Sequence, residues 1–405
     1  MLTPYRIKIT EKLMATSKNQ RTIKLINAGH NPFHIPADMV LIDLISDSGT
    51  GAMSSRQWAS MIEAREDFSG QKEAADLIST VRRVFGFNYV QPVHQGRAAE
   101  NILFKLTLKP GDMVVSNTHF ETTRANIESV GGKAIDLPDL RPPFCGNINI
   151  DRLQNLITKK TPKMVIMTIT SNINGGQPVS IKNLEQVKNL CLKNKIPVVF
   201  DASRFAGNAF LNKDNLDLKY NIQRIVKKMF KLCDLAYLSG KKDCLCNVGG
   251  LIMGRDKRIF ERITDQVIQQ ESYPSSGGMA ARDLAALNIG IQEAIDEDFL
   301  RNHIYNIRIM ASFLKKNQVM IFEPVGAHGI VIIPRSNIKY AAFSLAAQVF
   351  LQSGVRGGVF DGLFRLAIPR RVYTLEQLKF AVEEISRVYH QPLPRLKIIN
   401  KPGSF

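Results

Sequence analysis

Between about residue 80 and residue 255, short apolar runs alternate with stretches whose apolar residues recur at helical spacing. The runs at residues 112–117, 133–137, 164–170 and 197–201 predict strands. Between the last two runs, Ser180 is a typical N-cap for a helix that continues to about Lys195. The apolar positions of that helix are Leu184, Val187, Leu190 and Leu192. This order predicts an α/β fold with a mostly parallel sheet covered by helices on both faces.

The C-terminal third has a different pattern. Thr374 and Gln377 form a typical capping box that opens a helix with one apolar face. That face carries Leu375, Leu378, Val382, Ile385 and Val388. With the apolar run at 321–334 it predicts a smaller α+β lobe, followed by an irregular Pro-rich segment at 391–405. We expect an N-terminal arm and part of the small domain at 1–45, a large domain at 46–300, and the C-terminal small domain at 301–405.

The composition is that of a globular protein. Of the 405 residues, 44% are hydrophobic and 22% are charged, which excludes a disordered or collagen-like chain. No apolar stretch is long enough to span a bilayer, and Arg6 and Lys8 interrupt the N-terminus where a signal core would lie. The five cysteines follow no metal or disulfide spacing. We therefore expect a soluble, cytoplasmic protein with reduced thiols and no membrane partner.

The charge balance is strongly basic. Lys plus Arg number 54 and Asp plus Glu number 36, which gives a net charge of +18. Such an excess is compatible with a nucleic-acid partner. However, Lys227, Lys228 and Lys231 are spaced like the solvated face of a helix, and no basic motif is interleaved with aromatic residues. We expect no nucleic-acid partner, and a non-enzymatic nucleic-acid-binding protein is kept as a remote alternative.

The segment from Leu238 to Gly250 carries the most informative motif. It reads Leu-Ser-Gly-Lys-Lys-Asp-Cys-Leu-Cys-Asn-Val-Gly-Gly and places two lysines directly after a strand-like run. A lysine amine that can bond to a carbonyl, beside a phosphate held by Ser and Lys, is what a pyridoxal phosphate site requires. On its own the motif is also compatible with a solvated lysine pair in a turn.

Two other motifs agree with this interpretation. Asp201 lies at the end of a predicted buried strand, where open α/β sheets bind ligands, and a carboxylate there can keep a pyridine nitrogen protonated. The alternative is a buried Asp that caps a turn. Gln95, Gly96 and Arg97 open a predicted helix whose N–H groups favour a phosphate. The lysine lies 242 − 201 = 41 positions after the Asp, on a later strand, as in aspartate-aminotransferase-type folds.

Together these stretches resemble the β-eliminating lyases, the family of tyrosine phenol-lyase and tryptophanase. The matching stretches cover nearly the whole chain and read Ile35-Pro-Ala-Asp-Met39, Asp47-Ser-Gly-Thr50, His94-Gln-Gly-Arg97, Gly175-Gly-Gln-Pro-Val-Ser180, Asp201-Ala-Ser-Arg204, Ser239-Gly-Lys-Lys-Asp243, Glu323-Pro-Val-Gly326 and Ile368-Pro-Arg-Arg-Val-Tyr-Thr374. The residues of the last motif and of the lysine motif are more similar to those of tyrosine phenol-lyase than to those of tryptophanase. The resemblance implies a type I pyridoxal-phosphate fold and a site shared between subunits of a homodimer or homotetramer.

The resemblance also implies roles for individual residues. Lys242 would bind the cofactor covalently and remove the Cα proton of an amino-acid substrate, and Asp201 would pair with the pyridine nitrogen. The residues implied for the rest of the cofactor are Phe120 on the ring, Asn172 and Arg204 at the phenolic oxygen, and Gln95, Gly96, Arg97, Ser239 and Lys241 at the phosphate. Those implied for the substrate are Arg365 at the carboxylate, with Ser46, Ser48 and His328 nearby. For His328, an ordinary buried histidine is nearly as good an interpretation. A potassium ion is implied at Glu66 and at the carbonyls of Gly49 and Asn247.

The positions expected to face the substrate side chain depart from the family pattern. The tyrosine that protonates the leaving group in the family is replaced by Phe68, and a phenyl ring has no proton to give. The arginine that marks phenol substrates aligns with Phe360, and Glu121 follows Phe120 where Thr is found in tyrosine phenol-lyase.

These departures decide which reactions we expect. The first is Cα deprotonation and β-elimination of a group that departs without a strong acid, such as a thiolate or a carboxylate. The alternative is another pyridoxal-phosphate reaction on an amino acid, namely β-replacement, retro-aldol cleavage or transamination.

Overall fold

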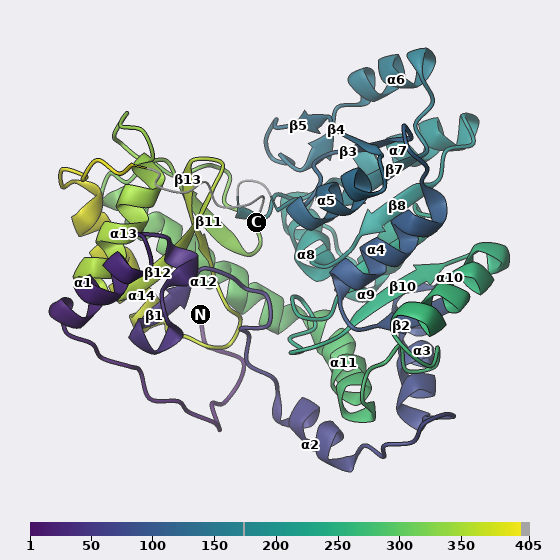
Figure 1. Cartoon of the computed structure of the whole chain (residues 1–405), viewed down its shortest axis with the longest axis horizontal. Coiled ribbons are helices and arrows are strands. Elements are labelled where there is room, and N and C mark those ends of the chain that lie inside the picture. Colours follow the sequence, from purple (N-terminus) through teal and green to yellow (C-terminus); the bar gives the residue numbers. More distant parts are fainter. Residues whose placement is uncertain (173–174, 398–405) are drawn as a thin grey trace. The chain divides into compact units, whose positions relative to one another are not determined.

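The computed structural model describes residues 1–172 and 175–397, so the last part of the Pro-rich segment lies outside the described residues. The chain forms two compact units, coloured along the sequence in Figure 1. The larger unit comprises Ser48–Asn302, and the smaller one combines Met1–Asp47 with His303–Phe405. Each unit is built around its own sheet.

The larger unit contains a seven-stranded sheet in the order β2-β10-β9-β8-β7-β3-β4. Strands β4, β3, β7, β8 and β9 are parallel to one another, whereas β10 is antiparallel to both β2 and β9. The strands are β2 (Tyr89–Val93), β3 (Met113–Ser116), β4 (Lys133–Asp136), β7 (Met164–Thr168), β8 (Val198–Asp201), β9 (Leu235–Ser239) and β10 (Gly250–Gly254). The expected α/β class with a mostly parallel sheet is confirmed.

The helices of this unit mostly alternate with the strands along the chain (Figure 1). They are α2 (Ser55–Glu63), α3 (Lys72–Phe85), α4 (Gly96–Thr107), α5 (Glu121–Ser129), α6 (Ile150–Lys159), α7 (Ile181–Lys193), α8 (Phe205–Asn215), α9 (Ile222–Phe230), α10 (Lys257–Gln270) and α11 (Ala281–Ala294). A short ribbon of β5 (Pro138–Asp139) and β6 (Asn147–Ile148) precedes α6. Helix α12 (Glu297–Lys316) begins in this unit and continues into the smaller one.

Side chains alternate between the two faces of the sheet because successive residues of a strand point to opposite sides. Val199 and Tyr237 belong to a buried cluster with α4, α5 and α10. Phe200 points the other way and contacts Phe230 of α9, with ring centroids 5.8 Å apart. Both faces are therefore covered, as the continuous apolar runs predicted, and Asp201 lies on the α4 and α5 side, two residues after Val199.

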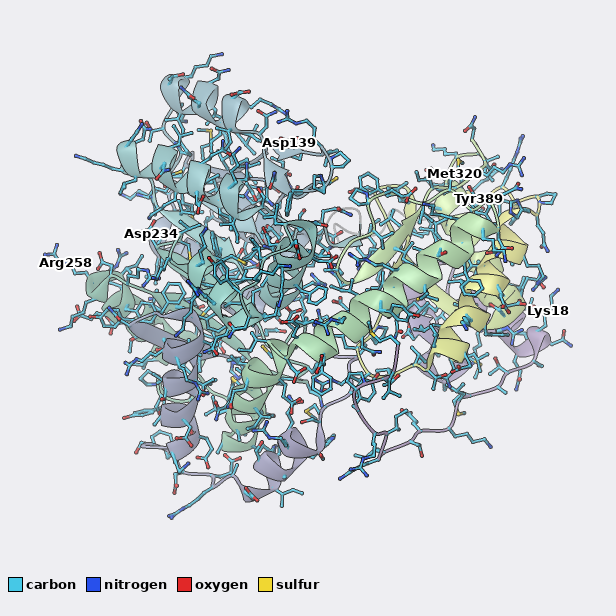
Figure 2. The ribbon with its side chains drawn as sticks, turned by 180° about the vertical axis from the view of Figure 1, so that it is seen from behind. Lys18, Asp139, Asp234, Arg258, Met320 and Tyr389 are labelled. Carbon is cyan, nitrogen blue, oxygen red and sulfur yellow. The ribbon has the colours of Figure 1, made fainter. Side chains whose placement is uncertain are left out.

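The predicted caps and strand runs agree with the structure to within two residues. Ser180 accepts the Asn183 N–H at the start of α7, and Asp234, labelled in Figure 2, accepts the Val198 N–H over 2.9 Å where β8 begins. All four apolar positions named for this helix lie on α7. Leu192 is nevertheless 66% exposed, because Cys191, four residues after Val187, occupies the buried side of α7.

The smaller unit contains a four-stranded sheet in the order β1-β12-β13-β11. Its elements are α1 (Lys18–Asn27), β1 (Ile42–Leu44), β11 (Gly329–Ile332), α13 (Ala341–Ser353), β12 (Val355–Phe360), β13 (Leu363–Ala367), α14 (Leu375–Tyr389) and the 3-10 turns η1 (Pro32–His34) and η2 (Ala37–Met39). Thr374 and Gln377 form the predicted capping box of α14, and Tyr389, labelled in Figure 2, donates to the Ile333 carbonyl over 2.9 Å. The unit is thus an α+β lobe built from both chain ends.

Two further expectations concern the cysteine thiols and membrane-spanning helices. All five cysteines are buried, and none forms a disulfide. Burial raises the pKa of Cys191 to about 12, so its thiol stays protonated at neutral pH. Among the described residues, no helix combines the length and apolarity needed to cross a bilayer.

Candidate active site

The ends of two neighbouring strands form the centre of the candidate site. Asp201 ends β8 and Ser239 ends β9, and both are buried. The Ser203 hydroxyl donates to Asp201 Oδ1 over 2.9 Å and accepts the Ser239 N–H over 3.1 Å. One hydroxyl therefore ties the two strand ends together at the carboxyl edge of the sheet, where open α/β sheets bind ligands.

The loop after β9 carries the two lysines and is anchored at both sides. The Gly49 N–H donates to the Lys241 carbonyl over 2.7 Å, and a Cβ on Gly49 would lie 2.7 Å from Lys241 Cε. On the other side, Asp243 Oδ2 accepts the N–H groups of Ala206 and Gly207 over 2.7 and 3.3 Å, in the first turn of α8. A carboxylate stabilises a helix N-terminus, so the lysine loop is fixed to α8.

Lys242 faces an aromatic ring. Its Nζ lies 4.7 Å from the ring centroid of Phe120, the N-cap residue of α5. Both side chains are half-buried. The structure thus brings together the lysine expected to bind the cofactor and the ring expected to stack on it.

Helix α4 provides an anion cradle beside Ser239. Gln95 is its N-cap, and the Ala98 and Ala99 N–H groups donate back to the Gln95 carbonyl. The first N–H groups of a helix have no intrahelical partner and favour an anion. A Cβ on Gly96 would lie 2.9 Å from Ser239 Cβ, so the helix start lies directly against the strand end. Gln95, Gly96 and Ser239 are therefore together, with exposed Arg97 next in the chain.

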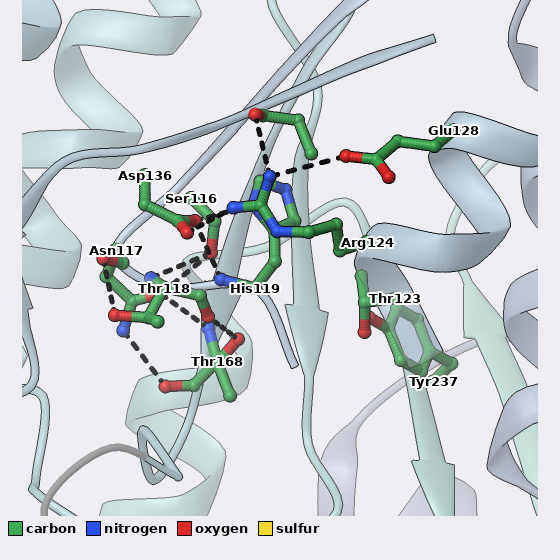
Figure 3. Close-up of polar contacts among 11 residues, drawn as sticks. Ser116, Asn117, Thr118, His119, Thr123, Arg124, Glu128, Asp136, Thr168 and Tyr237 are labelled. Atoms are coloured by element: carbon green, nitrogen blue, oxygen red, sulfur yellow. Dashed lines mark hydrogen bonds and ion pairs between the residues drawn. The ribbon is translucent and has the colours of Figure 1, made fainter. Parts of the chain in front are cut away.

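A charged cluster fixes the backbone just before Phe120 (Figure 3). Asp136 Oδ1 accepts the His119 N–H over 2.8 Å and lies 2.6 Å from His119 Nδ1, while Arg124 pairs with the other carboxylate oxygen. Burial raises the pKa of Asp136, but the hydrogen bonds from His119 outweigh it and the pKa is lowered. The cluster holds Phe120 at the start of α5.

Two of the residues expected at the cation site and the leaving group, Glu66 and Phe68, contact the start of α11 and the segment before it. The Glu66 carboxylate accepts the N–H groups of Ala281 and Arg282 over 2.8 and 3.4 Å. Phe68 is 81% exposed, and its ring centroid lies 5.4 Å from that of Tyr273. In the described part of the chain, no three His, Cys, Asp or Glu side chains are grouped to hold a metal ion.

In the smaller unit, Arg365 is stacked on Phe360. The guanidinium carbon lies 3.9 Å from the ring centroid, and Arg365 is 7% exposed. Phe33 contacts Phe360 edge-on, with centroids 6.0 Å apart. His328 is fully buried and its carbonyl accepts the Ile368 N–H. Phe360, which aligns with the arginine that marks phenol substrates in the family, thus supports Arg365, the arginine expected to bind the substrate carboxylate.

The other predicted site residues differ in exposure. Arg204 is buried at the N-cap of α8. Asn172, Ser46 and Ser48 are half-buried, and Glu121 and Asn247 are exposed. Sequence reasoning gave no role to Glu100, Asp243 or Tyr237, all of which are buried beside the site. The sequence could have indicated a role for Glu100, because it lies four residues after Gly96 and therefore on the same side of α4.

Comparisons with known proteins agree with this arrangement. Residues 43–340 match the family described as Beta-eliminating lyase. The chain is 38% identical to a tryptophanase of Salinibacter ruber, over 95% of this chain and 88% of that protein. It is 36% identical to a tyrosine phenol-lyase of Pasteurella multocida, over 95% and 92% of the two chains.

Solved structures share the fold. A Thermus thermophilus aspartate aminotransferase matches with a TM-score of 0.66 and 16% identity, over 92% of this chain and 95% of that one. The serine palmitoyltransferase of Sphingomonas wittichii matches with a TM-score of 0.67 and 13% identity, over 91% and 95%. These likenesses place the chain in the type I fold of pyridoxal-phosphate enzymes.

Proposed function

The chain belongs to the β-eliminating lyase family of pyridoxal-phosphate enzymes, and from this premise we propose that it removes the Cα proton of an amino acid and then eliminates the group on Cβ. The observation that carries the proposal is the placement of Lys242 over Phe120, 4.7 Å from Nζ to the ring centroid, beside the Asp201 and Ser239 strand ends. A base, a stacking surface, a buried carboxylate and an anion cradle thus come from one edge of one sheet.

The residues present fit the cofactor. Gly96 leaves no space for a side chain against Ser239, which keeps backbone N–H groups at the cradle, and Asp201 is a buried carboxylate suited to a protonated ring nitrogen. When bound, pyridoxal phosphate supplies an electron sink for the charge that develops at Cα. Lys242 Nζ would take the Cα proton, and Phe120 would stack on the cofactor ring. Asn172 and Arg204 would contact the phenolic oxygen, and Lys241 the phosphate.

We further propose that the substrate carries a leaving group that departs without a strong acid. Phe68 supports this, because it offers a phenyl ring where the family has the proton-donating tyrosine. A thiolate, whose parent thiol has an ordinary pKa of about 8.5, or a carboxylate satisfies the requirement. Cysteine-like and O-activated serine-like amino acids are therefore the proposed substrates.

The substrate carboxylate is proposed to bind Arg365. The stacked Phe360 and the buried position of Arg365 limit the motion of the guanidinium, which favours a bidentate pair with a carboxylate. Ser46, Ser48, His328 and Glu121 complete the proposed substrate contacts.

A potassium ion and a subunit interface belong to the same proposal. Glu66, with the carbonyls of Gly49 and Asn247, is proposed to bind the ion. Phe68 and Ile62, which are 81% and 84% exposed, are apolar surface that an identical subunit could cover. We therefore propose a homodimer or homotetramer, with the site shared between subunits, located in the cytoplasm.

The first test is a visible absorbance spectrum of the chain with pyridoxal phosphate. We expect a bound-cofactor band in wild type and in Lys227→Ala, whose lysine lies on the exposed side of α9, and its loss in Lys242→Ala. Equal bands in all three proteins would contradict the assignment of Lys242.

The second test is a panel of amino acids assayed for pyruvate and ammonia. Release from S-substituted cysteines is expected, with little release from tyrosine or tryptophan. Release from tyrosine as fast as from the best cysteine derivative would contradict the argument from Phe68. Exchange of the Cα proton without pyruvate would favour β-replacement, retro-aldol cleavage or transamination instead.

A further inference from the structure

Gln57 is a buried amide whose two ends bond to different parts of the larger unit. It lies on α2 and is 0% exposed. Its Oε1 accepts the Ser54 N–H over 3.0 Å, which belongs to the capping box of α2. Its Nε2 donates to the Cys244 carbonyl over 3.0 Å and to the Ala286 carbonyl over 3.2 Å. The cap uses only Oε1, and none of the roles assigned above uses Nε2.

The Cys244 carbonyl belongs to the turn that begins at Lys242. The Leu245 N–H donates to the Lys242 carbonyl over 3.1 Å, and the Cys246 N–H donates to the Gly240 carbonyl over 3.0 Å. Leu245 has a φ of 55°, in the left-handed region that a leucine rarely adopts. Such a backbone conformation persists only where surrounding contacts hold it. The turn therefore depends on contacts from outside the loop.

Gln57 makes such contacts on both sides of Leu245. Besides its bond to the Cys244 carbonyl, Gln57 Nε2 lies 3.7 Å from Cys246 Sγ. The Cys246 thiol donates to the same carbonyl over 3.3 Å, and burial raises the pKa of this thiol, so it stays protonated. A thiol is a weak donor, so the amide is the stronger of the two donors to the Cys244 carbonyl.

Helix α11 leaves space for this arrangement at a glycine. Helices α2 and α11 pack against each other (Figure 1). A Cβ on Gly290 of α11 would lie 2.1 Å from the Cys244 carbonyl oxygen and 2.9 Å from Gln57 Nε2. Any other residue at position 290 would displace the carbonyl or the amide. The lysine loop, α2 and α11 thus meet at one point, where Gln57 Nε2 bonds to the other two.

The chain that leads into α2 reaches the lysine loop twice. The Gly49 N–H donates to the Lys241 carbonyl, one residue before Lys242. Gln57 donates to the Cys244 carbonyl, two residues after Lys242. The backbone that carries Lys242 is therefore held from both sides by one short segment.

We propose that Gln57 is a positioning residue, which fixes the turn after Lys242 so that the lysine amine is aimed at the Cα proton. The inference rests on the proposed function of Lys242. Gln57 itself takes part in no bond-breaking step. Without its Nε2, the Cys244 carbonyl keeps only the weak thiol donor on that side, and the turn gains freedom. A misplaced base slows proton transfer more than it weakens substrate binding, so the effect falls on kcat.

The test compares wild type with two variants at position 57. Gln57→Leu removes the donor, whereas Gln57→Glu keeps the acceptor for the Ser54 N–H and has a donor only while its carboxyl group is protonated. Gln20→Leu is the matched control, because Gln20 occupies the same capping-box position in α1 and is exposed. Hydrogen–deuterium exchange of the full-length protein, without and with pyridoxal phosphate, reports the Leu245 and Cys246 amides. Exchange of the Cα proton of an S-substituted cysteine in deuterated water gives kcat per bound cofactor, and KM.

The loss of the donor should loosen the turn and slow proton removal. In Gln57→Leu the two amides should exchange at least about 10-fold faster than in wild type, and kcat should fall by at least about 10-fold with KM unchanged. Gln57→Glu should behave like wild type at pH 6.5 and like Gln57→Leu at pH 9, because a buried carboxyl group keeps its proton to a higher pH than an exposed one. Gln20→Leu should match wild type in both measurements.

Three results would overturn the inference while leaving the proposed function intact. One is equal amide exchange in wild type and Gln57→Leu, and another is faster amide exchange with an unchanged kcat. If Gln57→Leu does not fold, Gln57→Glu decides, and a ratio to wild type that is the same at pH 6.5 and pH 9 is the third. Wild type that binds the cofactor but exchanges no Cα proton of any amino acid would refute the proposed function instead.

Discussion

Replacement of Asp243 by alanine is a sharp test of how the lysine loop is held. Asp243 is 2% exposed, and its Oδ2 accepts two backbone N–H groups over 2.7 and 3.3 Å at the start of α8. Alanine leaves both donors buried without this acceptor, and each such loss costs about 1–3 kcal/mol. Because the longer bond is weaker, we take about 3 kcal/mol for the pair.

The expected result is a large fall in thermal stability. For a domain of the size of the larger unit, each kcal/mol shifts the midpoint by about 2–4 °C, so Asp243→Ala should lower Tm by about 6–12 °C. Asp243→Asn keeps an acceptor and should lose less than half as much. The control is Asp76→Ala, because Asp76 forms an exposed ion pair with Lys72 that is worth at most about 1 kcal/mol.

Differential scanning calorimetry at one scan rate measures all three variants. A shift below about 2 °C for Asp243→Ala, or a shift equal to that of Asp76→Ala, would refute the view that this carboxylate fixes the loop to α8.

Three other changes test separate parts of the proposed chemistry. Phe68→Tyr supplies a proton donor, so the rate of elimination of poor leaving groups should rise by about 10²–10⁴-fold, while the rate for good leaving groups should not change. Pyruvate assays with both kinds of substrate measure this, and an equal change in the two rates would disprove it. Phe360→Leu removes a cation–π contact worth about 0.5–2 kcal/mol, so KM should rise about 2–30-fold with kcat unchanged, and a fall in kcat alone would contradict the stacking role. The pKa of Glu100 is raised from an ordinary 4.5 to about 7 in the folded protein, so the folded state binds this proton more tightly than the unfolded state. The stability that the protonated Glu100 contributes is therefore lost as pH rises from about 4.5 to 7. Urea unfolding should show this loss in wild type relative to Glu100→Gln, and parallel pH profiles of the two proteins would exclude it.

The sequence was sufficient for features that depend on local chemistry. Ser180 and Thr374 are N-caps because their hydroxyls reach N–H groups three residues on, and this geometry is the same in any helix. The strands that end at Asp201 and Ser239 follow from apolar runs that only a covered sheet buries on both faces. The family resemblance then pointed to Lys242 and Phe120, which the structure brings together.

The sequence was not sufficient where burial depends on distant parts of the chain. Glu100 stood inside a recognised motif, yet its hydrogen-bond partners come from α5, and its pKa is raised first by burial and then by Asp201, 101 positions away (201 − 100). Leu192 lies on the predicted helix, yet the sequence did not decide whether it is buried, and the packing places Cys191 on the buried side of α7. The burial of these residues is not encoded within a single helical turn.

The most direct test of the central claim identifies the amino acid that binds the cofactor. The purified chain with pyridoxal phosphate is treated with borohydride, which makes a lysine–cofactor bond permanent, and is then digested for peptide mass spectrometry. We expect one pyridoxyl group, on Lys242, which is absent from Lys242→Ala. A group on Lys241, a scatter over surface lysines, or no modified peptide in wild type would contradict the assignment.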